Sequence, residues 1–95
     1  MDIISMIPIG HDNGVTLSDL VKRTGAGERE IRNAISKARN AVVIVNLQDG
    51  KGYFIPTEKE AGLAYKWLKQ EEARERNHRA TLKGARKFLN SRKGL

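Results

Sequence analysis

The sequence predicts a mainly α-helical fold with a small β-hairpin and a long basic helix at its C-terminal end. Three observations lead to this prediction: two helical apolar repeats separated by a glycine-containing turn, a β-branched run followed by Asp-Gly, and a last third without proline. The 95 residues suit one small domain, which buries roughly two-thirds of the surface of its unfolded chain. Such a domain leaves little room for a deep catalytic cavity.

The N-terminal residues predict a short helix over Asp2–Ile7. Three isoleucines lie on one helical face at spacings of three and four, and Pro8 ends the helix because it has no backbone N–H to donate. After a turn at residues 11–14, Val15 is expected to form a strand of one residue.

Two further helices follow, joined by a short turn. Thr16 is expected to cap the first helix with Asp19 in a capping-box role, and Gly25 to end it in the left-handed conformation. The second helix is predicted over about residues 28–39, with Gly27 as its N-cap. Its apolar residues recur at helical spacing: Ile31, Ala34, Ile35 and Ala38. Two short helices so closely joined have the dimensions of a helix-turn-helix.

After residue 40 the apolar pattern changes from helical to β. Residues 42–45 are contiguous and β-branched, which favours a strand. Asp49-Gly50 is a strong hairpin signal, and residues 53–55 are expected to form the return strand, which Pro56 stops. Tyr53 and Phe54 alternate faces on this strand, so we expect one of them to pack on the core, and a platform that stacks on single-stranded nucleic acid finds little support.

The last third predicts one long helix. Thr57 and Glu60 form a capping box, and no proline interrupts the chain from there to about Asn90. Apolar residues become scarce within 69–79 and then return at helical spacing, which predicts a dimerisation surface made by Leu82, Phe88 and Leu89. Three arrangements remain open: two tails that clasp each other, one helix broken near Gln70–Asn77 and folded back, or a frayed monomeric tail.

The net charge of +7 lies entirely in this last third. Residues 1–65 carry eight Lys+Arg and eight Asp+Glu, whereas residues 66–95 carry ten Lys+Arg and three Glu. A basic surface indicates an anionic partner, and nucleic acid is the leading candidate. We therefore divide the chain into a domain over residues 1–68 and a basic helical tail over residues 69–95.

The order helix, turn, helix and hairpin resembles a known family. The run TLSDLVKRTGAGEREIRNAISKARNA, followed by a hairpin that closes on GYFIPTEKE, resembles the winged helix-turn-helix DNA-binding domain. It is similar to small phage and prophage regulators and to the N-terminal domain of biotin-repressor-like regulators. The resemblance covers residue 3 to about residue 68 and implies double-stranded DNA as the partner. The second motif helix would enter the major groove, and the hairpin, called the wing, would touch the backbone or the minor groove.

Polar side chains opposite the apolar stripe of the second motif helix are the candidates for base contacts: Arg29, Arg32, Asn33, Ser36 and Lys37. Arg and Asn form bidentate hydrogen bonds with guanine and adenine edges. In the wing, Gln48 and Lys51 are the candidates for DNA contacts. In the tail, the candidates for phosphate contacts are Arg79, Lys83, Arg86 and Lys87.

Other function classes find little support. A chain without cysteine has no disulfide framework and no thiolate zinc site. His11 and His78 stand apart from any catalytic or metal-ligand motif and are expected to be solvated, so we predict no enzyme activity, metal or cofactor. The chain has no apolar run of membrane-spanning length and no signal-peptide pattern, which favours a cytoplasmic protein with neither a membrane nor a small-molecule partner.

We expect a homodimeric transcriptional regulator, because symmetric dimers suit palindromic DNA sites and the chain has no room for an effector domain. Two other functions remain open: a phage DNA replication or packaging accessory, and an adaptor that uses a winged helix to bind a protein without binding DNA. The zero net charge of residues 1–65 supports the adaptor.

Overall fold

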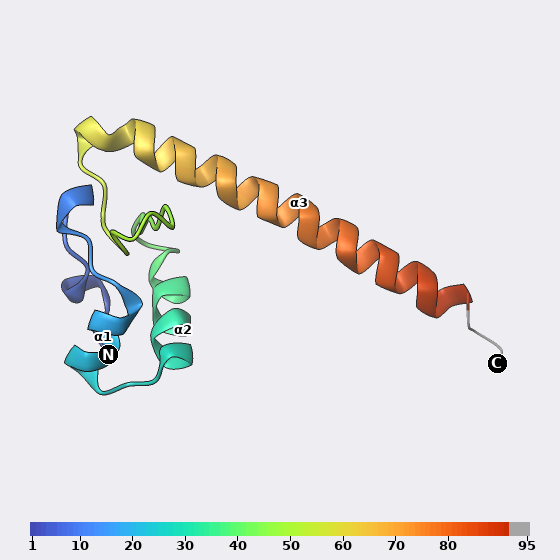
Figure 1. Ribbon diagram of the computed structural model, residues 1–95, viewed down its shortest axis with the longest axis horizontal. Helices are drawn as coiled ribbons and strands as arrows, with labels where there is room; N and C mark the ends of the chain where they lie inside the picture. The colour runs from blue at the N-terminus through green and yellow to red at the C-terminus, as the bar shows by residue number, and fades with distance from the viewer. Residues whose placement is uncertain (92–95) are drawn as a thin grey trace.

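The computed structural model describes residues 1–91 and confirms a mainly α-helical fold. These residues form the 3₁₀ turns η1 (Ile4–Met6), η2 (His11–Asn13) and η3 (Glu58–Glu60), and the helices α1 (Leu17–Thr24), α2 (Glu28–Ala38) and α3 (Ala61–Ser91). The segments before α3 pack together, and α3 leads away from them (Figure 1). The radius of gyration is therefore 17.2 Å, well above the ~12 Å of a compact domain of this length.

The predicted helix ends around α1 and α2 are confirmed. Thr16 Oγ1 accepts the backbone N–H of Asp19 at 3.1 Å, and the Asp19 carboxylate accepts the N–H of Thr16 at 3.4 Å. Gly25 follows α1 with a φ of 72°, a left-handed conformation that glycine adopts without steric cost. Gly27 is the N-cap of α2, so the second helix begins almost at once.

The N-terminal helix predicted over Asp2–Ile7 is wrong in length, because only η1 forms there. The Asp2 carboxylate accepts the N–H of Ser5 at 3.4 Å, and Ser5 Oγ donates to the Asp2 carbonyl at 2.9 Å. Such side-chain bonds compete with helical hydrogen bonds, and Pro8 prevents elongation. The isoleucines of this segment nevertheless pack into the core.

The predicted hairpin is wrong in its strands, since residues 1–91 contain isolated β-bridges and no strand. Each residue of the predicted return strand pairs with a different segment: Tyr53 with Val15, Phe54 with Val45, and Ile55 with Ile9. The one-residue strand expected at Val15 is thereby confirmed. Residues 53–55 join three segments instead of closing one hairpin ladder.

Two residues stop the antiparallel bridge of the predicted hairpin from growing into a ladder. On one side, the next hydrogen-bonded pair would need a backbone N–H from Pro56, which has none. On the other side, Gly52 has a φ of 85°, outside the extended region. Its missing Cβ lets the backbone pass against the Val15 carbonyl, which any side chain at this position would overlap.

Two hydrophobic clusters hold the elements together. The larger lies among the N-terminal segment, α1 and α2, and its residues Leu20, Ile31 and Ile44 are 0% exposed. The smaller is made of Val45, Leu47 and Phe54, and the first turns of α3 pack on it through Leu63, Ala64 and Trp67. Because burying one large apolar side chain stabilises a fold by about 1.5–3 kcal/mol, this small cluster suffices to anchor the start of α3.

α3 is continuous to Ser91, as the capping box and the absence of proline predict. Ahead of it, the Glu60 carboxylate accepts the N–H of Thr57 at 3.0 Å. The alternative of a helix broken near Gln70–Asn77 and folded back is therefore wrong. A break would expose backbone groups that the unbroken helix pairs internally.

Leu68, near the start of α3, is 46% exposed and is not among the residues that pack on the smaller cluster. It lies one residue past Trp67, on a different side of the helix. The boundary predicted between residues 68 and 69 falls inside α3. Residues 92–95 of the predicted tail lie outside the described residues.

Candidate nucleic-acid interface

The exposed face of α2 carries the five side chains predicted to contact bases. At helical spacing, Arg29, Asn33 and Ser36 form the middle of this face, and Arg32 and Lys37 form its two edges. All five are exposed, while the opposite side of α2 is buried in the larger cluster. Arg32 forms an exposed ion pair of 4.0 Å with the glutamate one turn before it, and such pairs add little to stability.

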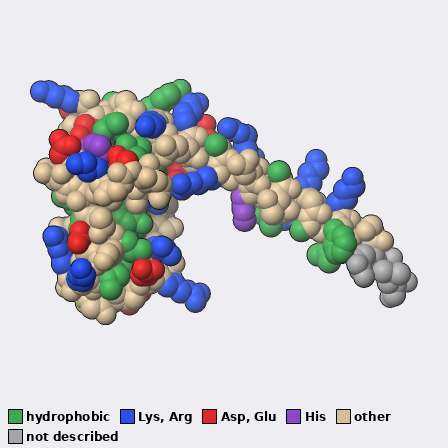
Figure 2. Space-filling view, in the orientation of Figure 1, with side chains coloured by type: hydrophobic (Ala, Val, Ile, Leu, Met, Phe, Trp, Pro, Cys, Tyr) green, Lys and Arg blue, Asp and Glu red, His purple; other side chains and the backbone are tan. Residues whose placement is uncertain are grey.

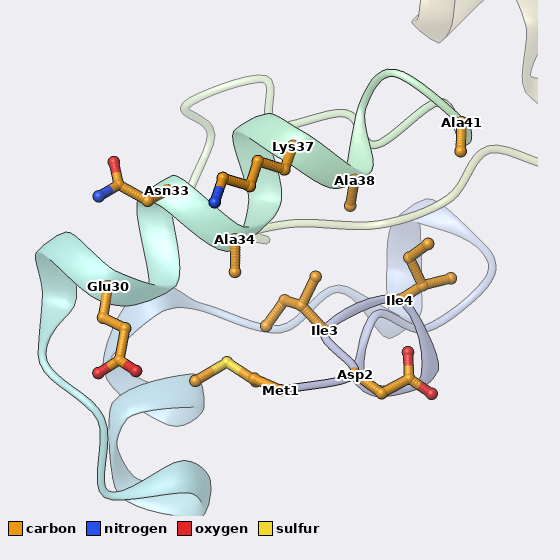
Figure 3. A pocket seen from close by; sticks show the side chains of 10 residues that line it. All are labelled: Met1, Asp2, Ile3, Ile4, Glu30, Asn33, Ala34, Lys37, Ala38 and Ala41. Atoms are coloured by element: carbon orange, nitrogen blue, oxygen red, sulfur yellow. The ribbon is translucent and has the colours of Figure 1, made fainter.

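On the Lys37 edge, α2 borders a groove of about 630 Å³ against the N-terminal residues (Figure 3). The side chains of Ala34 and Ala38 point across this groove toward Ile3, whereas Asn33 points away from the N-terminal segment. Small side chains on this flank let the N-terminal segment lie close to α2. The polar residues of the exposed face are left outside that apolar contact.

On the Arg32 edge, α2 borders a polar cleft of about 220 Å³ that is shared with the loop over residues 46–53 and with α3. Arg32, Arg39 and Arg74 supply its positive charges. The carboxylate in the cleft, Glu71, accepts a hydrogen bond from Arg74 Nη1 at 2.9 Å. Three arginines and one glutamate sum to +2, so this cleft is cationic although residues 1–65 are neutral as a whole.

Arg39, just beyond the last turn of α2, is the residue of this cleft that the sequence analysis missed. Its Nε donates to the Ile44 carbonyl at 2.9 Å. Its Cζ lies 4.9 Å from the ring centroid of Trp67 and 5.9 Å from that of Tyr53, within cation–π range. The only sequence signal was an arginine directly after a helical repeat, which is common on solvated helix ends.

The predicted wing residues are both exposed but have different settings. Gln48 lines the cleft and has a φ of 61°, in the left-handed region that residues other than glycine seldom adopt. Its N–H donates to Asn46 Oδ1 at 2.9 Å, and the N–H of Lys51 donates to Asp49 Oδ1 at 3.1 Å. Side-chain bonds of this kind, rather than a strand ladder, shape the loop.

His11 was expected to be solvated, and this is wrong, because its side chain is 22% exposed and bonded on several sides. Its Nε2 lies 2.6 Å from Asp49 Oδ2, its ring packs edge-on to Phe54 with centroids 5.1 Å apart, and its backbone N–H donates to Glu60 at 3.0 Å. The hydrogen bond from His11 holds the pKa of Asp49 below its usual range. Backbone N–H groups of Thr57 and His11 likewise lower the pKa of Glu60. These contacts fasten the wing loop to the segment that starts α3.

The outer half of α3 has an apolar face in line with the residues through which the start of α3 packs on the smaller cluster. Spacings of three and four residues put Leu82, Ala85 and Leu89 on the side of the helix that Ala64 and Trp67 use to contact the domain. In Figure 2 the apolar side chains of this outer half project from the side that looks toward α2. The predicted dimerisation residues Leu82, Phe88 and Leu89 are 39%, 58% and 64% exposed.

The predicted phosphate-contacting residues of α3 point elsewhere. Lys83 and Lys87 lie opposite the apolar face, and Arg79 and Arg86 lie beside it; all four are exposed. Arg79 also forms an ion pair with Glu75, one turn earlier. The Lys and Arg side chains of the outer half project away from α2 in Figure 2. The basic face of the tail and the exposed face of α2 thus do not form one continuous surface.

Nowhere in residues 1–91 do His, Asp and Glu side chains gather in a group that could hold a metal ion. None of the described helices combines the length and the apolarity needed to cross a membrane. No family model, curated protein or solved structure matches this chain.

Proposed function

We propose that this chain is a winged helix-turn-helix protein that binds double-stranded DNA with α2 in the major groove and acts as a small transcriptional regulator, of the type that phages and prophages use. The observation that carries the proposal is the exposed face of α2, where Arg29, Asn33 and Ser36 stand on a helix whose other side is locked in the core. An α-helix fits the major groove, and each good bidentate contact discriminates by about 1–3 kcal/mol against the wrong base.

The packing of α1 and α2 supports the same proposal. The left-handed Gly25 and the extended Gly27 turn the chain sharply between the two helices. Leu20 of α1 and Ile31 of α2 share the larger cluster, so the two helices form one rigid unit. In DNA-binding proteins with this motif, the first helix crosses the backbone while the second reads base edges.

The outer half of α3 supports a homodimer as the working form. Leu82, Ala85 and Leu89 extend the seam through which the start of α3 already packs, but here no part of residues 1–60 lies beneath them. A second copy of α3, packed against this face, would bury it and leave the basic residues outside. A symmetric pair of domains would then read two half-sites of a palindrome.

Binding to DNA is tested by selecting duplexes from a random pool and measuring their affinity by fluorescence anisotropy. We expect Asn33→Ala and Arg32→Ala each to weaken the selected duplex by roughly 5- to 150-fold, the equivalent of 1–3 kcal/mol. Lys59→Ala, which removes one exposed positive charge from η3, is the control and should change affinity only slightly. Retention of full specificity by both α2 variants would refute the assignment of this face to base contacts. A wild-type chain that binds no duplex even at low salt would favour the protein-binding adaptor.

The homodimer is tested by light scattering of the full chain at several concentrations. Leu82→Glu together with Leu89→Glu should give a monomer, because two charges would be buried in an apolar seam. The matched control, Lys83→Glu with Lys87→Glu, places the same side chains on the opposite face and should remain dimeric. A wild-type chain that is monomeric at all concentrations would refute the dimer.

A further inference from the structure

The polar cleft on the Arg32 edge of α2 contains a guanidinium that is fixed in place but not neutralised. The Ile44 carbonyl accepts the Nε–H of Arg39, and the Arg39 Cζ lies 4.9 Å from the Trp67 ring centroid and 5.9 Å from that of Tyr53. Within residues 1–91, no carboxylate oxygen lies within 4.0 Å of this guanidinium, and its terminal nitrogens have no hydrogen-bond acceptor. A planar cation with free donors therefore lines the cleft.

The surroundings of Arg39 make its positive charge costly. Burial lowers the pKa of Arg39; Tyr53 and Glu71 oppose this lowering, and Arg74 adds to it by a smaller amount. A partly desolvated cation beside a second cation gains free energy when an anion enters. The side chain is also ordered in advance by its ring contacts, so little conformational entropy remains to be lost on binding.

The other groups in the cleft specify the kind of anion. Arg32 and Arg74 add two more guanidinium groups, and Asn46 and Gln48 add neutral side-chain amides. Arginine matches the geometry of phosphate oxygens with parallel N–H donors. The carboxylate of Glu71 competes for these donors and is already bonded to Arg74, but the cleft keeps a net charge of +2.

We propose that this cleft binds a phosphate group, and that in the DNA complex it holds a backbone phosphate beside the groove that α2 occupies. The identity of this phosphate rests on the proposed function, because Arg32 belongs both to the cleft and to the edge of the base-contacting face. Arg74 brings α3 into the interface on its domain-facing side. The cleft thus provides a phosphate contact between the domain and the first half of α3, separate from the basic face of the outer tail.

In the first test, inorganic phosphate or pyrophosphate is added to the full chain, and binding is measured by the fluorescence of Trp67, the single tryptophan. Because Trp67 lies against Arg39, an anion in the cleft should change its emission, and sodium chloride at equal ionic strength should not. We expect Arg74→Gln to weaken phosphate binding roughly threefold to tenfold and Glu71→Gln to strengthen it by a similar factor. The controls Arg76→Gln and Glu72→Gln make the same changes of charge on other sides of α3 and should titrate like the wild type.

The second test measures the affinity for the selected duplex across a range of salt concentrations. Arg74→Gln should lower the slope of log affinity against log salt by about 0.9, the loss of one phosphate contact. Arg76→Gln has the same net charge and should keep the wild-type slope. Arg39→Lys keeps the charge but loses the planar donor set, so it should weaken binding while circular dichroism shows an intact fold.

The outcomes separate the cleft from the proposed function. If the wild type responds to phosphate and the variants change this response as expected, but no duplex binds, the phosphate site stands. Its role in a DNA complex and the proposed function are then both overturned. Duplex binding in which Arg74→Gln and Arg76→Gln behave alike would keep the proposed function and overturn the cleft. Equal responses of Trp67 to phosphate and to chloride would overturn the cleft as well.

Discussion

In residues 1–60, six large apolar side chains are less than 2% exposed, whereas α3 has no buried residue along Ala61–Ser91. The charges divide the other way: residues 1–60 sum to zero, and residues 76–91 carry five Lys+Arg and no Asp or Glu. Burial therefore stabilises the part of the chain without net charge, and the charged part depends on its own helical hydrogen bonds. The net charge of the whole chain reflects the tail, and it does not reveal the cationic cleft between the domain and α3.

The largest expected effect comes from making the same change, phenylalanine to alanine, in each of the two regions. Phe54→Ala removes a ring that is 0% exposed from the cluster that anchors α3, and should destabilise the fold by about 3–5 kcal/mol. Phe88→Ala removes a ring that is 58% exposed, and should change the stability of the domain by less than about 0.5 kcal/mol. Urea denaturation followed by Trp67 fluorescence measures both values.

Two results would contradict this difference between the two regions. A Phe88→Ala variant as unstable as Phe54→Ala would mean that the outer half of α3 contributes to the fold of residues 1–60. A Phe54→Ala variant close to the wild type would mean that the smaller cluster does not anchor α3. Denaturation at several protein concentrations distinguishes a loss of dimer stability, which depends on concentration, from a loss within one chain.

A pair of glycine substitutions tests the same difference between the domain and α3 at the backbone. Gly52→Ala would strain a residue at φ 85° and push a Cβ into the Val15 carbonyl, so it should cost more than about 1–2 kcal/mol of domain stability. At Gly84 an added Cβ meets nothing within 4 Å, and alanine should stabilise that part of the helix by about 0.5–1 kcal/mol. Hydrogen exchange resolved along the chain should show faster exchange in the domain of the first variant and slower exchange around residue 84 in the second. Slower exchange throughout the first variant would contradict the close approach of Gly52 to Val15.

The smallest expected effect is on the unfolding free energy at acid pH, and it too should be confined to the domain. The pKa values of Asp19, Asp49 and Glu60 are all lowered in the folded state by hydrogen bonds to Thr16, His11 and Thr57, in that order. A carboxyl group whose folded pKa is lowered stabilises the fold above its unfolded pKa, and this stability is lost as the pH falls through the folded pKa. Unfolding free energy should therefore decline as the pH falls below about 4.

Asp49→Asn should make that decline shallower, because one of the contributing carboxyl groups no longer titrates. Asp12→Asn is the control, since the Asp12 side chain beside the same histidine is 93% exposed. Thermal melts between neutral pH and pH 2 measure both slopes. An unchanged acid limb in Asp49→Asn would show that the bond between His11 and Asp49 does not stabilise the fold.

Helix ends were predictable because their causes lie within a few residues. The capping boxes at Thr16 and Thr57, the stop at Gly25 and the start of α2 after Gly27 each depend on neighbours at most four positions away. The hairpin prediction was wrong because residues 53, 54 and 55 each pair with a different segment. Asp-Gly marks a turn, but it cannot say that only Phe54 pairs with Val45, while Tyr53 pairs with Val15 and Ile55 with Ile9.

The exposed face of α2 was predictable for a related reason. Once Ile31 and Ile35 are assigned to the core, the helical period determines which polar residues are exposed. The cleft of Arg39 was not predictable, because its groups come from positions 32 to 74 of the chain. Whether an arginine after a helix is solvated or lies against aromatic rings depends on where α3 docks.

The chain alone predicts its helices, their caps, the exposed face of α2 and the division into a neutral segment, residues 1–65, and a basic tail. These features follow from periodicity, charge and side-chain hydrogen bonds over short stretches. The folded structure was needed to show that His11 bonds to Asp49, 38 positions away, and that Arg39 lies against Trp67. The reason is physical: contacts between distant segments depend on how buried surfaces fit together, and a local pattern contains no information about that fit.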